Sequence, residues 1–174
     1  MASKVSLKIN VMNLIRENFS DRQVRRAYTE LFRNDTVKKE FGRRVIDSIT
    51  ERTQERNIDK KGVRFTGYSQ SYKNSHVFEV YGKSSSDVNL TLSGEMIASM
   101  IVSGTTPDSV VISFASQEQN DKAHGHINGI KRRVSKKGPM GKVKRDFFGL
   151  PKDEQVTVLK GTIKDFVNGE FDFE

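Results

Sequence analysis

Residues 35–56 read DTVKKEFGRRVIDSITERTQER, and this stretch decides the fold. Apolar residues return in it with the spacing of one helix face, while Lys, Arg and Glu occupy the other faces. Asp35 or Thr36 supplies the polar residue that favours a helix start. The stretch therefore predicts a long amphipathic helix that begins at 35 or 36 and ends near Arg56. Its apolar stripe consists of Val37, Phe41, Val45, Ile46 and Ile49.

Helical patterns also occur on both sides of this stretch. Asp21 and Ser93 are suitable N-caps, and each precedes apolar residues at helical spacing. Pro151 stands where the first turn of a helix tolerates proline, and a further apolar stripe follows it. Asn120 or Asp121 can cap a short helical turn that ends at Gly129. The predicted helices cover residues 21–32, 93–103, 120–129 and 151–167.

Three stretches have the pattern of strands. Apolar and polar residues alternate over residues 5–11, which predicts a strand near the edge of a sheet. The run VFEVY at 77–81 has high β-propensity, and VVISF at 110–114 is an apolar run bounded by polar turns. Both runs predict strands, the second of them buried. Residues 59–75 interleave Gly and Ser with aromatic residues, which indicates an ordered loop.

The positive charge of the chain is confined to one segment. The 174 residues carry 30 Lys and Arg against 22 Asp and Glu, a formal net charge of +8. Residues 131–145 hold eight of these cations and no acid, so the remainder of the chain is formally neutral. We expect a single domain over 1–174, with 1–20 as an N-terminal strand or arm and 131–145 as a basic loop or hairpin arm. The eight cations are Lys131, Arg132, Arg133, Lys136, Lys137, Lys142, Lys144 and Arg145.

The composition excludes several classes of protein. The absence of cysteine excludes disulfides, thiolate zinc sites and cysteine nucleophiles. No apolar stretch approaches the length of a membrane span or of a signal-peptide core, so we expect a chain that is made and kept in a cytoplasm unless an assembly carries it out. The apolar content of 34% is lean, which suggests extended segments or burial completed by partners.

We expect no catalytic, metal or cofactor site, and therefore no enzyme. His124 and His126 are two residues apart, so on a helix they face different sides, and His76 has no acidic cluster nearby. The phosphate-binding glycine motifs GxxxxGK[ST] and GxGxxG do not occur. Asp153 and Glu154 follow Pro151 as acids favoured at a helix N-terminus.

The basic segment is the strongest physical signal in the sequence. Eight cations in 15 residues repel one another unless a polyanion or an acidic partner neutralises them. Nothing in the segment is arranged to recognise base edges, so contact with nucleic acid would be independent of sequence. The alternatives are contact with an acidic protein surface and a solvated loop that keeps the protein in solution.

Four strings occur in order along the chain: DKKGVRFTGYSQSY (59–72), VNLTLSGEMIASM (88–100), KAHGHING (122–129) and RDFFGL (145–150). In order and spacing they resemble the virion-morphogenesis and tail-completion family of tailed bacteriophages, over roughly residues 37–167. The family-motif residues are Tyr68, Tyr72, Leu92, Gly94, Met96, His124, Gly129, Arg145, Phe147, Phe148, Gly149 and Leu150.

The resemblance implies an α+β fold in which a small antiparallel sheet packs against a long helix, with extended loops. It implies a structural subunit of the virion, located at the neck or upper tail after synthesis in the cytoplasm of the bacterial host. Such a subunit is a neck, tail-completion or tail-terminator protein that forms a homo-oligomeric ring of six copies. Its partners would be adjoining connector, neck or tail-tube proteins and, without sequence specificity, the viral double-stranded DNA, with no membrane. The alternative from another class is a sequence-independent nucleic-acid-binding protein that uses residues 131–145.

Overall fold

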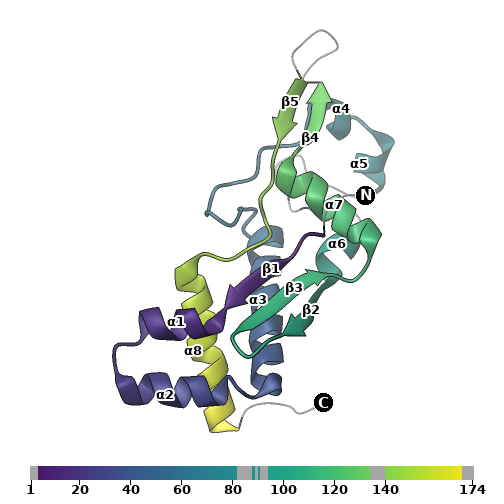
Figure 1. Ribbon diagram of the computed structural model, residues 1–174. Helices are drawn as coiled ribbons and strands as arrows, with labels where there is room; N and C mark the ends of the chain where they lie inside the picture. Colours follow the sequence, from purple (N-terminus) through teal and green to yellow (C-terminus); the bar gives the residue numbers. More distant parts are fainter. Residues whose placement is uncertain (1–3, 82–87, 89, 91–93, 134–139, 170–174) are drawn as a thin grey trace. The chain divides into compact units, whose positions relative to one another are not determined.

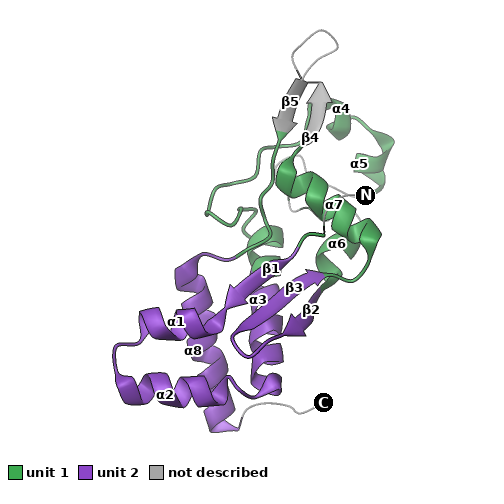
Figure 2. Cartoon of the chain, viewed as in Figure 1, with its two compact units in different colours: residues 1–5, 49–100, 114–149 green, residues 6–48, 101–113, 150–174 purple. Residues whose placement is uncertain are grey.

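The computed structural model describes residues 4–81, 88, 90, 94–133 and 140–169. Two compact units divide the chain, and Figure 2 colours them separately. Unit 1 comprises residues 1–5, 49–100 and 114–149, and unit 2 comprises residues 6–48, 101–113 and 150–174. The expectation of a single domain over 1–174 stays a prediction.

The sheet has three strands: β1 (Leu7–Asn10), β2 (Met100–Thr105) and β3 (Ser109–Phe114), in the order β1-β3-β2. β1 pairs antiparallel with β3, and Leu7 lies opposite Ile112. The sheet packs against the long helix α3 (Asp35–Gln54) and against α8 (Lys152–Asn168), as Figure 1 shows. The predicted α+β class, with a small antiparallel sheet on a long helix, is therefore confirmed, and β1 is the predicted edge strand.

Unit 2 also contains α1 (Val11–Asn18) and α2 (Arg22–Leu31). Asp21 caps α2 as predicted, because its carboxylate accepts from the backbone N–H groups of Gln23 and Val24. The predictions of α3 and α8 are likewise confirmed. Arg44 of α3 forms an ion pair with Asp165 of α8, which ties these two helices together.

Unit 1 holds the short helices α4 (Gln70–Lys73), α5 (His76–Val80) and α6 (Glu95–Ala98), and the longer α7 (Gln117–Asn128). After α7 come β4 (Ile130–Arg133) and β5 (Met140–Val143), which pair antiparallel as a hairpin. The residues 134–139 that join these two strands lie outside the described part of the chain. Phe114, Phe147 and Phe148 pack together in unit 1 with ring centroids 4.9–6.4 Å apart.

Four sequence-based assignments are wrong. The helix that ends at Gly129 begins at Gln117, and its N-cap is Ser116 rather than Asn120 or Asp121. Residues 11–18 form α1 rather than the end of a strand, because the Asn10 side chain caps a new helix at the Asn13 N–H. Residues 76–80 form a helix, because Ser75 caps the Phe78 N–H. Residues 100–105 form a strand paired with β3, so the helix predicted over 93–103 is confined to α6. The proposed N-cap Ser93 lies outside the described residues, and Gly94 occupies the N-cap position.

Candidate functional site

Arg145 lies at the base of the basic hairpin. Its backbone N–H donates to the His126 carbonyl at 2.8 Å, which joins the chain that follows β5 to the helix that precedes β4. Its guanidinium carbon lies 5.5 Å from the ring centroid of Tyr68, and its Nη2 donates to the Thr66 carbonyl at 3.3 Å. Only 9% of the residue is exposed. These contacts anchor both ends of the hairpin in unit 1.

The ring of Tyr68 belongs to an aromatic cluster. Tyr68 and Tyr72 have ring centroids 5.1 Å apart, and Phe78 packs edge-on against both at 5.6 and 5.4 Å. Edge-to-face packing of this kind adds attraction beyond burial of the rings.

The turn that follows Arg145 is held from two sides. Arg52 of α3 is fully buried, and its Nη2 donates to the Phe147 carbonyl at 2.9 Å and to the Gly149 carbonyl. On the other side, Lys60 Nζ lies 2.9 Å from Asp146 Oδ2, and the Lys60 N–H donates to the Asp146 carbonyl at 3.0 Å. Charge-assisted bonds to backbone carbonyls fix the path of this turn.

The second and third strings meet through α6 and α7, which contact each other. Lys122 of α7 lies 2.7 Å from Glu118 and 3.9 Å from Glu95 of α6. The hydrogen bond with Glu118 is the main cause that raises the pKa of Lys122. Gly94 and Gly129 both have positive φ, at the start of α6 and the end of α7, where glycine avoids strain.

The family-motif residues thus lie mainly in one unit. Leu92 is outside the described residues. Leu150 is buried and is the first residue of the last segment of unit 2. Unit 1 contains Tyr68, Tyr72, Gly94, Met96, His124, Gly129, Arg145, Phe147, Phe148 and Gly149.

The basic residues have different positions. In the hairpin register, Lys131 lies opposite Lys142 and Arg132 opposite Gly141. Arg133 ends β4, Lys144 is exposed after β5, and Lys136 and Lys137 are outside the described residues. The Arg145 side chain contacts Tyr68 and Thr66 within unit 1, and its predicted contact with DNA or a neighbouring ring stays a prediction.

The described residues contain neither a metal-binding cluster nor a membrane-spanning helix. They contain no cluster of three His, Asp or Glu that could hold a metal ion. None of their helices has the length and apolar content needed to cross a membrane. We compared the chain with protein-family models, with curated proteins and with solved structures, and none of the three comparisons gave a match.

Sequence reasoning missed two arginine features. Arg52 reads as one charge among many in residues 35–56, and nothing in its neighbours signals its burial. The second feature is a group of arginines on α1 and α2. Arg16 lies on α1, and Arg22, Arg25 and Arg26 share one face of α2 with spacings of three and four residues. That spacing was available from the sequence once α2 was assigned.

Proposed function

We propose that the protein is a structural subunit of a tailed-bacteriophage virion at the head-to-tail junction. In this role it is a neck, tail-completion or tail-terminator protein that assembles as a ring around the DNA passage. The observation that carries the proposal is the convergence of the family strings: Arg145 of the fourth string contacts Tyr68 and Thr66 of the first and His126 of the third. Residues that resemble one family in sequence and also contact one another support a shared fold.

Two surfaces of unit 1 suit an assembly role. The hairpin carries Lys and Arg on a base that the motif contacts hold in place, so cations can be presented to DNA or to an acidic neighbour. The short helix α5 exposes Val77 and Val80 by 45% and 63%, and its C-cap Tyr81 is exposed by 52%. Exposed apolar side chains grouped on one element are typical of contact surfaces between proteins.

Cryo-electron microscopy of virions of the phage that encodes the chain tests the proposal. We expect density for residues 145–150 in a ring at the head-to-tail junction, with copy number six. The same map identifies what residues 131–145 touch. Absence of the chain from particles that carry all other structural proteins would overturn the proposal.

A second candidate is a free-standing nucleic-acid-binding protein that uses the same hairpin without sequence preference. The observation in its favour is the register, because Lys131 and Lys142 occupy directly paired positions. A polyanion would neutralise the cations of such a segment and release its own counterions. Binding of short duplexes by the isolated monomer, weakened by salt, would favour this candidate. A well-folded protein that binds no duplex at low salt would eliminate it.

A further inference from the structure

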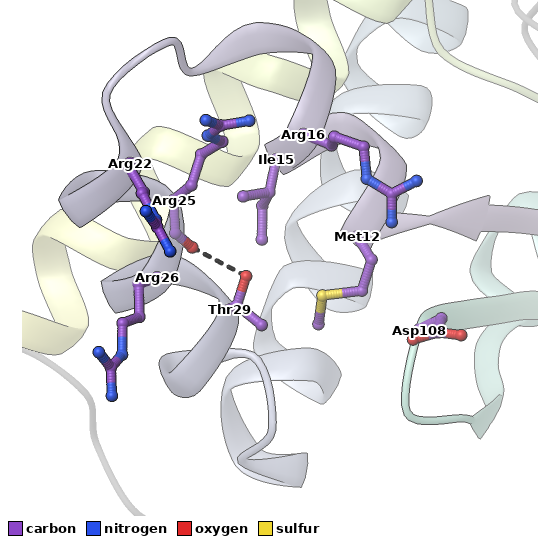
Figure 3. A pocket seen from close by; sticks show the side chains of 8 residues that line it. All are labelled: Met12, Ile15, Arg16, Arg22, Arg25, Arg26, Thr29 and Asp108. Carbon is purple, nitrogen blue, oxygen red and sulfur yellow. Dashed lines mark hydrogen bonds between the residues drawn. The ribbon is translucent and has the colours of Figure 1, made fainter.

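Unit 2 contains a pocket of about 550 Å³ between α1, α2 and the turn that joins β2 to β3. Figure 3 shows the arginines of both helices around it. One arginine comes from α1, three come from the first part of α2, and a single carboxylate lies on the β2–β3 turn. These five residues are Arg16, Arg22, Arg25, Arg26 and Asp108. The ionic lining of the pocket therefore has a net charge of +3.

The arginines of α2 stand where cations are unfavourable. Apart from the N-cap Asp21, the first turn of α2 has no acidic residue, and the partial positive charge at a helix N-terminus repels cations. Arg22 and Arg26 are also spaced i and i+4, an arrangement that is destabilising for like charges. Within the described part of the chain, no ion pair or side-chain hydrogen bond involves the guanidinium groups of Arg16, Arg22, Arg25 or Arg26. An anionic ligand would offset these repulsions.

The remaining lining of the pocket favours a peptide over a bare phosphate. Met12 and Ile15 of α1 contribute apolar surface, and Thr29 of α2 lies beside them. Ile15 is buried and Met12 is half-buried, so an apolar side chain of a ligand can cover what is left of Met12. The carboxylate of Asp108 disfavours dense negative charge such as a nucleic-acid backbone. The chemistry fits a segment that alternates acidic and apolar residues.

Residues 170–174 of this sequence have that pattern. They read EFDFE, so three carboxylates alternate with two phenyl rings, and their charge of −3 equals the pocket charge with opposite sign. Arginine pairs with carboxylates through two parallel hydrogen bonds, which suits it to such a ligand. We propose that the arginine pocket binds residues 170–174 of a second copy of the chain.

The ring of the proposed function favours a second copy over the same chain, because a ring needs one contact from each copy to the next. A contact from one copy to the next is head-to-tail, and such contacts generate a ring where the rotation between copies closes. This inference rests on the ring of the proposed function.

Peptide binding tests the pocket without requiring a ring. The protein is the full chain with Glu170→Gln, Asp172→Asn and Glu174→Gln, which leaves its pocket available. The probe is a fluorescein-labelled peptide NGEFDFE, followed by anisotropy. We expect saturable binding that weakens by about tenfold in the added variant Arg22→Glu/Arg26→Glu. The matched control Lys39→Glu/Lys164→Glu, which changes two exposed lysines of unit 2, should bind as tightly as the parent.

Two control peptides separate the contributions of charge and rings. NGQFNFQ keeps the phenyl rings and NGESDSE keeps the carboxylates, and we expect both to bind more weakly than NGEFDFE. The proposal would be overturned if NGEFDFE bound equally tightly to the Arg22→Glu/Arg26→Glu variant and to the Lys39→Glu/Lys164→Glu control. It would also be overturned by a pocket variant that loses affinity for a DNA duplex while its affinity for the peptide is unchanged, because the ligand would then be phosphate.

Mixing experiments test the contact between copies. One partner is the pocket variant Arg22→Glu/Arg26→Glu, and the other is the tail variant Glu170→Gln/Asp172→Asn/Glu174→Gln. Together they can form only one contact, between residues 170–174 of the pocket variant and the pocket of the tail variant. Native mass spectrometry should therefore show a heterodimer and no larger ring. Charge reversal on both sides, Arg22→Glu/Arg26→Glu with Glu170→Lys/Asp172→Lys, should restore assembly. Rings that form normally from the pocket variant overturn this inference and leave the proposed function standing. Absence of the wild-type chain from virions overturns the proposed function, and peptide binding still decides the pocket.

Discussion

At the scale of single residues, two groups of arginines look identical in the sequence and have different surroundings in the structure. Arg52 and Arg145 are buried, and their guanidinium groups donate to backbone carbonyls of unit 1. Planar groups with several donors can satisfy a tight turn in this way. The arginines of the α1–α2 pocket lack such partners within the described residues. Burial separates the two groups, and burial depends on contacts that are distant in sequence.

Arg52→Met is expected to destabilise the protein by about 3 kcal/mol, because the Phe147 and Gly149 carbonyls lose a charged donor in a buried site. Arg56→Met, at a half-exposed position two residues after α3, should change stability by less than about 0.5 kcal/mol. Urea unfolding followed by circular dichroism measures both. Equal losses for the two variants would show that Arg52 does not support the turn.

Glu40 provides a test by pH. Its pKa is lowered, chiefly by the hydrogen bond from Arg43, although burial opposes this effect. The stabilisation is therefore fully present above the ordinary pKa of glutamate and is lost as the pH falls through the lowered value. We expect Glu40→Gln to be less stable than wild type near about pH 6, and this difference to shrink towards about pH 3. Thermal unfolding across that range measures it, and a constant difference would contradict the assignment.

At the scale of elements, local signals predicted the helices α2, α3 and α8, but they did not predict competition between elements. VFEVY at 77–81 has strand propensity, yet Phe78 packs on Tyr68 and Tyr72 from a helix. Met100 and Ile101 continue the apolar spacing of the α6 region, yet residues 100–105 pair with β3. In each case a partner from another segment decided the structure. The contacts that join the four strings were beyond prediction for the same reason.

The two glycines inside long helices of unit 2 should respond in opposite ways to alanine. A Cβ on Gly42 of α3 would lie 2.6 Å from Val102 Cγ2 and 2.9 Å from Val110 Cγ1, so Gly42→Ala should destabilise by about 1–2 kcal/mol. A Cβ on Gly161 of α8 would lie 3.8 Å from Arg44 Nη1, so Gly161→Ala should stabilise by up to about 1 kcal/mol. Urea unfolding compares them, and stabilisation by both substitutions would contradict close packing of α3 on the sheet.

At the scale of the whole molecule, positive charge is segregated. The sequence predicted this feature fully, because residues 131–145 carry the entire excess of +8. The sequence did not indicate that Arg145 is engaged in unit 1, nor that four other arginines share a pocket in unit 2. Counting charge along the chain identifies segments, whereas grouping of residues from separate helices depends on the fold.

The salt dependence of duplex binding should follow the hairpin. Lys131→Gln/Arg132→Gln/Arg133→Gln should reduce the slope of log affinity against log salt by about 2.7, since each phosphate contact contributes about 0.9. A control that changes the exposed Lys4, Lys39 and Lys164 to Gln should keep the wild-type slope. Fluorescence anisotropy with a short duplex at several salt concentrations gives both values. Unchanged slopes in the hairpin variant would place any DNA contact elsewhere.

The path of the chain through the two units has a consequence for inheritance. The polypeptide passes from one unit to the other five times, at 5/6, 48/49, 100/101, 113/114 and 149/150, and one of these boundaries falls inside α3. Neither unit corresponds to a continuous stretch of gene. A recombination event that exchanges one block of coding sequence therefore cannot transfer either unit whole without part of the other. Such an exchange consequently joins segments of different origin within a unit, and the packing contacts between these segments must remain compatible.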